Sequence, residues 1–123
     1  MGTIRDILKQ IELHDSIIES MTIQGDGSLE LALEIDEIWN KEQNSTINGI
    51  RFKSVYEISD FKIDRLNVIG DIEVKDIEGY NKEFVIHAEN EPEKVTMVSI
   101  TLVAGGCLNI ICSDLVELLQ CHA

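Results

Sequence analysis

A histidine and an aspartate stand side by side in the segment LHDSIIESMTI, residues 13–23, where the apolar pattern changes its period. His14 has the residue type of a general base or metal ligand, and Asp15 that of its orienting partner or a second ligand. The pair also has a structural interpretation, because a histidine at a helix C-terminus interacts with the dipole and an aspartate there bonds a turn backbone. Adjacent side chains tend to point apart on entering a strand. We therefore favour a joint between helix and strand, including Ser16, over an active site.

The remaining histidines and cysteines do not complete a recognisable site. The sequence has no H-x-x-x-H, CxxC or HExxH pattern, and Cys107 and Cys112 have a spacing that suits no common zinc motif. Nucleophile elbows, glycine-rich phosphate loops and the EF-hand pattern are also missing. We predict no catalytic residue, no metal and no cofactor, and the sequence favours a protein that is not an enzyme.

The net charge of −13 restricts the partners that the surface can attract. A surface this negative repels nucleic-acid phosphate and anionic lipid, whereas it attracts a basic protein. Aromatic residues beside carboxylates would form a suitable binding surface. The candidates for this surface are Trp39, Tyr56, Tyr80, Asp71 and Glu73.

Cysteine usage and the N-terminus predict a cytoplasmic location. The chain has three cysteines, an odd number, and its first residues carry charges where a secretory signal would be apolar. The uncharged run 95–112 has the length of a short membrane span, but it is rich in β-branched residues and interrupted by Gly105 and Gly106. Two buried strands joined at a glycine turn explain this run better than a membrane helix.

The apolar periodicity predicts one helix followed by strands. Thr3 is a candidate cap for an amphipathic helix over about 4–13, and clean alternation predicts an antiparallel hairpin from 17–23 and 29–36. Val55 breaks the parity of a strand that starts at Ile50, which indicates a bulge at this position. Further strands are expected at 61–77, with a kink or bulge at Gly70, at 84–88 and in the pair 95–112. The tail 113–121 fits either a short helix or a final edge strand.

These elements indicate a single domain, 1–123, of the α+β class with mainly antiparallel strands. About seven short strands imply a curled sheet, either a half-barrel or a sandwich. The N-terminal helix is apolar on one face only, so we expect it to pack over an open side of that sheet.

The string LHDSIIESMTI followed by SLELALEID resembles a group of small uncharacterised bacterial proteins. In these an "HDS" or "HDA" element opens a β-rich domain after a short helix, and some are immunity-like proteins of toxin systems. The segments GIRFKSVYEI and GGCLNIICSDLVEL agree with that pattern. The resemblance implies a type of fold, and it supplies no catalytic role for His14, Asp15 or Ser16.

Three functions fit these observations. The first is a non-catalytic protein-binding module that docks a basic partner, as an immunity protein docks a toxin. The second is a small metal-dependent or acid–base enzyme that uses His14 and Asp15, and the third is a small-molecule carrier. Homodimerisation is compatible with all three, because small β-rich domains often protect exposed edge strands by pairing them.

Overall fold

A computed structural model describes residues 2–36, 47–59, 67–77 and 95–120. These residues form one antiparallel sheet with the strand order β1-β9-β4-β3-β2-β6-β7-β8-β5, and within them the sheet does not close into a barrel. The predicted α+β class with a mainly antiparallel, curled sheet is confirmed. The elements are β1 (Gly2–Thr3), α1 (Ile4–Gln10), β2 (Ile17–Ile23), β3 (Leu29–Glu34), β4 (Ile47–Phe52), β5 (Val55–Ser59), β6 (Asn67–Ile77), β7 (Val95–Leu102), β8 (Cys107–Ser113) and β9 (Leu115–Gln120).

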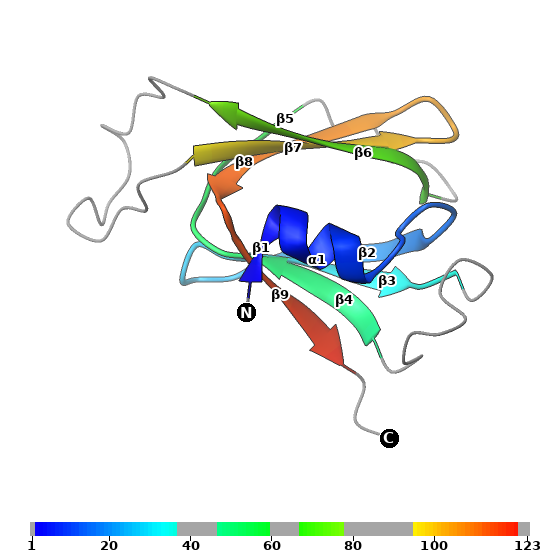
Figure 1. The fold of residues 1–123 in the computed structure, drawn as a ribbon, viewed down its shortest axis with the longest axis horizontal. Helices are drawn as coiled ribbons and strands as arrows, with labels where there is room; N and C mark the ends of the chain where they lie inside the picture. The colour runs from blue at the N-terminus through cyan, green and yellow to red at the C-terminus, as the bar shows by residue number, and fades with distance from the viewer. Residues whose placement is uncertain (1, 37–46, 60–66, 78–94, 121–123) are drawn as a thin grey trace.

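The sheet folds over into two layers that share a core. Figure 1 shows β6, β7, β8 and β5 above, and β2, β3, β4 and β9 below. The layers are joined at a short pairing of β2 with β6, where Ile17 and Ile18 lie opposite Val68 and Asn67. Alternate residues of each strand face inward, as the sequence periodicity predicts. The core includes Ile18, Leu29, Leu31, Leu33, Ile50, Phe52, Ile69, Val98, Ile100, Leu102, Leu108, Ile110, Cys112 and Val116.

The described chain also crosses between the layers twice, from β4 to β5 and from β8 to β9, and these two crossings are hydrogen-bonded to each other. Ser113 Oγ donates to the carbonyl of Lys53 (2.8 Å), and the Lys53 amide donates to the carbonyl of Leu115 (3.0 Å). Ser54 bends the chain with a φ of 49°. The expectation of one strand running from Ile50 past position 55 is therefore wrong. The broken parity marks the point where the chain leaves β4 for β5, and the β5–β8 register also shifts just after Val55.

Helix α1 closes the opening between the layers, as expected. Thr3 is its N-cap, because its hydroxyl accepts a hydrogen bond from the Asp6 amide (3.2 Å). The helix ends at Gln10 and not near 13, because Ile11 is extended (φ −138°, ψ 135°). In that extended segment Ile11 and Leu13 are both buried, so a period of two begins before the His14–Asp15 pair. The buried residues of the helix are Ile4 and Ile7, and burying each of these side chains stabilises the fold by about 1.5–3 kcal/mol.

Several local predictions have clear outcomes. The hairpin of β2 and β3 is confirmed, and so are the pair β7–β8 and the irregularity at Gly70, where the β6–β7 register shifts. The tail forms strand β9, which resolves the choice between helix and strand because Val116 is fully buried and pairs with Phe52 of β4. The expected strand at 84–88 lies outside the described residues. The described residues form nine strands: six of the about seven expected strands lie in them, the division of one into β4 and β5 adds one, and β1 and β9 add two.

Among the residues that the model describes, no helix is both long enough and apolar enough to cross a membrane.

Candidate functional site

The joint at 13–16 is a tight turn that attaches the start of β2 to β6. Asp15 has a φ of 67°, the left-handed conformation that aspartate and asparagine tolerate better than most residues. The Asp15 amide donates to the Ile69 carbonyl, and the Ile69 amide donates to the Ser16 carbonyl, each at 2.8 Å. The Ser16 amide donates back to the Leu13 carbonyl at 3.0 Å. The turn therefore pairs with Ile69 of β6 through the backbone of Asp15 and Ser16.

Ser16 links the joint to the end of β3. Its side chain is fully buried, and its hydroxyl accepts a hydrogen bond from the Asp36 amide at 3.1 Å. Asp36 follows β3, so this single hydroxyl connects the beginning of one strand of the hairpin to the end of the other. A buried serine with such a backbone partner has a structural role at this position.

The imidazole of His14 lies between two oxygen atoms, and one of them is its hydrogen-bond acceptor. Its Nδ1 lies 2.7 Å from the Gly70 carbonyl oxygen, which can only accept, so Nδ1 carries the hydrogen. Its Nε2 lies 3.4 Å from Asp15 Oδ1, and both side chains are a little over 40% exposed, at 43% and 44%. His14 and Asp15 thus face each other, contrary to the expectation that they point apart. The reason is the left-handed backbone of Asp15, which replaces the extended conformation assumed for that residue.

A cleft of about 400 Å³ opens beside this joint, between the end of α1 and β6. Its floor is apolar, and Ile11, Leu13 and Ile69 in it are each at least 94% buried. Its polar lining is anionic apart from the imidazole. The lining residues are Leu8, Ile11, Glu12, Leu13, His14, Ile69, Gly70, Asp71 and Ile72.

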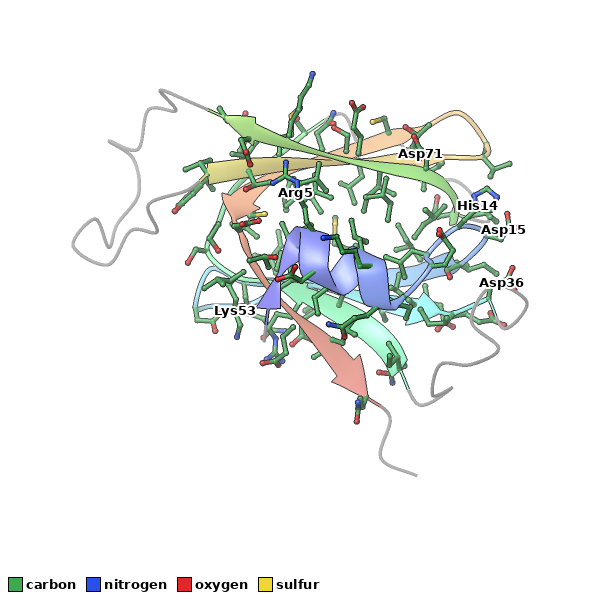
Figure 2. The ribbon with its side chains drawn as sticks, in the orientation of Figure 1. Arg5, His14, Asp15, Asp36, Lys53 and Asp71 are labelled. Carbon is green, nitrogen blue, oxygen red and sulfur yellow. The ribbon has the colours of Figure 1, made fainter. Side chains whose placement is uncertain are left out.

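Four carboxylates lie at the same end of the molecule as His14, and we refer to Glu12, Asp15, Asp36 and Asp71 as the acidic end. Figure 2 shows Asp71, His14, Asp15 and Asp36 gathered at one side, with Arg5 and Lys53 well away from them. Glu12 also accepts a hydrogen bond from the His14 amide (3.0 Å). No described lysine or arginine lines the cleft.

The described arginines are engaged elsewhere. Arg5 pairs with Asp76 at 3.0 Å, which fixes α1 to β6. Arg51 lies between Glu30 and Glu117 on the outer face of β3, β4 and β9, and contacts both. The hydrogen bond to Glu30, followed by the nearby carboxylates, raises the pKa of the Arg51 guanidinium. These arginines therefore do not counter the charge of the acidic end.

The predicted aromatic–acidic surface is only partly represented in the described residues. Asp71 and Glu73 are exposed on the same outer face of β6. Tyr56 belongs to β5, three strands away in the order β6-β7-β8-β5, which corresponds to roughly 14 Å across the sheet. The structure therefore does not bring Tyr56 next to this acidic pair. Trp39 and Tyr80 lie outside the described residues.

The described residues contain no group of three or more His, Cys, Asp or Glu that could hold a metal ion. Burial, with a smaller effect of the Asp114 charge, raises the pKa of the Cys112 thiol to about 12. A thiol with this pKa stays protonated and unreactive near neutral pH. Cys107 lies on the other face of β8, so it cannot form a disulfide with Cys112.

Sequence reasoning identified His14, Asp15, Ser16 and Asp71 but missed Glu12 and Asp36. Asp36 reaches the acidic end because the β2–β3 register places the residue after β3 next to Ser16. The alternating pattern of 29–36 contained that register information, since it required the end of β3 to lie opposite the start of β2. Glu12 carried no such signal, because its position depends on where α1 ends.

No protein-family model matches the chain, and no curated protein matches its sequence.

Proposed function

We propose that the protein is a non-catalytic binding module that docks a basic protein partner through its acidic end, in the manner of an immunity protein that docks a toxin. The observation that supports this proposal is the gathering of Glu12, Asp15, Asp36 and Asp71 at one side, away from the labelled cations Arg5 and Lys53. A surface of one sign attracts an opposite surface and speeds encounter by about 10- to 1000-fold at low ionic strength.

The residues of the joint support binding over chemistry. Ser16 is buried and occupied by the Asp36 amide, and the Nδ1 of His14 is occupied by the Gly70 carbonyl. A rigid turn of this kind can present carboxylates in a constant geometry, which reduces the entropy lost on binding. We also place the protein in the cytoplasm, consistent with the free thiols of Cys107 and Cys112.

The test is an affinity capture from a cell extract at low salt, with a charge variant of the acidic end. The triple variant Asp15→Asn, Asp36→Asn and Asp71→Asn removes three negative charges, and asparagine tolerates the left-handed backbone at position 15. The wild-type protein should capture a basic protein, and the triple variant should lose it.

A matched variant separates local recognition from total charge. Asp6→Asn, Asp26→Asn and Glu57→Gln change three exposed carboxylates that do not line the cleft. This control has the same net charge as the test variant and should retain the partner. The proposal is refuted if the wild-type protein captures nothing basic at low salt, or if both variants lose the partner equally.

A second candidate function is acid–base or metal-dependent catalysis at His14, and one observation favours it. The ring lines a cleft and has its Nδ1 fixed by a carbonyl, the arrangement that orients catalytic and metal-binding histidines. Metal analysis of the purified protein and a His14→Ala variant test this candidate. A variant that loses only thermal stability, with no bound metal in the wild-type protein, assigns His14 a structural role.

A further inference from the structure

We propose that the space beside and beneath α1 binds one small, uncharged and mainly apolar molecule, such as a short alkyl chain with a hydroxyl head. The cleft beside His14 is the entrance to this site, and a second cavity, deeper between the two layers, takes the apolar end of the ligand. The inference adds a ligand to the protein, and it does not rest on the proposed function.

The deeper cavity is wholly apolar. It lies where α1 meets both layers of the sheet (Figure 1), and its lining includes Ile4 of α1, Leu31 and Phe52 of the lower layer, and Val98 and Ile100 of the upper layer. None of its lining residues exposes a polar atom to it. Its volume, counted for the centre of a water-sized sphere, is about 10 Å³, which is room for about one water molecule or a group of similar size. A water molecule would find no hydrogen-bond partner there, and apolar cavities of this kind accept apolar molecules instead.

Four side chains separate this cavity from the cleft. Leu8, Leu13, Ile69 and Ile72 line both spaces. Leu13 and Ile69 are buried, whereas Leu8 on α1 and Ile72 on β6 are only partly buried. Because side chains change rotamer without a change in the backbone, a rotamer change at Leu8 or Ile72 is enough to extend the cleft into the cavity. With the cleft at about 400 Å³, the joined site has the size of a small-molecule pocket, about 300–1,000 Å³.

The charges around the cleft exclude an anionic ligand. No described lysine or arginine lines the cleft, and the carboxylates of the acidic end lie at the same side of the molecule. A carboxylate or phosphate head would therefore be repelled and would have no cationic partner in the cleft.

The cleft also lacks a specific site for a cationic head. Asp71 lies with Glu73 on the outer face of β6, in the register position opposite Thr101 of β7, and Glu12 accepts a hydrogen bond from the His14 amide. An uncharged head needs no ionic partner, because it can stay in the water at the mouth of the cleft. The affinity then comes from the removal of the alkyl chain from water against the apolar floor.

The test compares three probes of equal chain length by nuclear magnetic resonance of the methyl-labelled full chain. Hexan-1-ol has one hydroxyl, hexane-1,6-diol has a hydroxyl at each end, and hexanoate has a carboxylate. We expect hexan-1-ol to produce saturable shifts of the methyl signals of Leu8, Val98 and Ile100. The diol should bind at least about tenfold more weakly, because its second hydroxyl would enter the apolar cavity without a hydrogen-bond partner. Hexanoate should also bind more weakly than hexan-1-ol.

Three outcomes would overturn the inference. They are the absence of saturable shifts with hexan-1-ol, equal binding of hexan-1-ol and the diol, and equal binding of hexan-1-ol and hexanoate.

Two variants locate the apolar end of the ligand. Val98→Ile adds one carbon atom at the lining of the deeper cavity and fills it. This variant should weaken the binding of hexan-1-ol by about four- to fifteenfold, which corresponds to one or two methylene groups that are no longer buried. Val103→Ile is the matched control, because it adds the same atom at an exposed position that lines neither space. Unchanged binding in Val98→Ile, or equal weakening in both variants, would contradict the assignment, and the comparison of probes on the wild-type protein decides it if Val98→Ile does not fold.

The probes and the capture experiment give independent results. If hexan-1-ol binds as described and no basic protein is captured at low salt, this inference stands and the proposed function fails. If a basic protein is captured but hexan-1-ol produces no saturable shifts, this inference fails and the proposed function stands.

Discussion

The removal of one buried hydroxyl tests whether the HDS element is a joint. In the Ser16→Ala variant, the Asp36 amide loses the oxygen that accepts its hydrogen bond at 3.1 Å. An unsatisfied buried donor costs about 1–3 kcal/mol, and the partial exposure of Asp36 lets water offset some of this loss. We therefore expect a loss of about 1–2 kcal/mol in the free energy of unfolding, which for a chain of this length lowers Tm by about 4–8 °C.

The assay is thermal and urea unfolding followed by circular dichroism, with capture of the basic partner as a second readout below Tm. Ser20→Ala is the control, since Ser20 is exposed on the same strand and its removal should change stability by at most about 0.5 kcal/mol. Folded Ser16→Ala protein should still capture the partner. An unchanged Tm together with lost binding would refute the joint, because it would show that Ser16 acts in recognition and not in folding.

Three further predictions concern the sheet and its titratable groups. Gly49→Ala would place a Cβ 2.7 Å from a carbonyl oxygen of β3, so urea unfolding should show a loss of about 1–3 kcal/mol, whereas Gly25→Ala, with no atom within 4 Å, should be nearly neutral. Because burial raises the pKa of Cys112 to about 12, iodoacetamide at pH 8 should label this thiol only after unfolding, as peptide mass mapping can show. Hydrogen bonds from the Ser28 hydroxyl and amide lower the pKa of Asp26, so its contribution to stability is complete above the unfolded pKa of about 3.9 and disappears as the pH falls through the folded pKa. Below about pH 4, the urea midpoint should therefore fall less steeply with decreasing pH in the Asp26→Asn variant than in the wild-type protein. Equal slopes of urea midpoint against pH in the two proteins would contradict this link.

The sequence-based predictions were accurate where the interacting residues are close in the sequence, and less accurate where the interacting residues are far apart in it. The β2–β3 hairpin was predictable, because alternation along 29–36 and a short turn determine both the buried face and the partner. The tail was not, since the leucines and Val116 of 115–119 suit one face of a helix as well as a strand. Only the pairing of β9 with β4, more than 60 residues earlier, decides between them. Local patterns therefore revealed the class of the fold but not its complete strand order.

The acidic end depends on still longer-range pairing. Asp36 and Asp71 come together because β2 pairs with β3 on one side and with β6 on the other. No short pattern in the sequence joins these positions, and the net charge does not indicate where on the surface the carboxylates gather. The broken parity at Val55 was the one local sign of a layer change, and it was first interpreted as a bulge within a single strand.

A structural role for His14, Asp15 and Ser16 does not remove them from function, because their contacts set the geometry of the cleft. The turn binds β6 through the Ile69 backbone and the Gly70 carbonyl, immediately before Asp71, which is one of the residues around the cleft. The β6–β7 register shifts between Ile69 and Asp71, and a bulge of this kind re-aims the side chains that follow it. The joint and the bulge together therefore set the position of Asp71 in the acidic end. It follows that a change in the joint can weaken binding through the position of Asp71 alone. Loss of binding assigns a direct contact only where, as with Asp71→Asn, the backbone bonds of the turn are left intact.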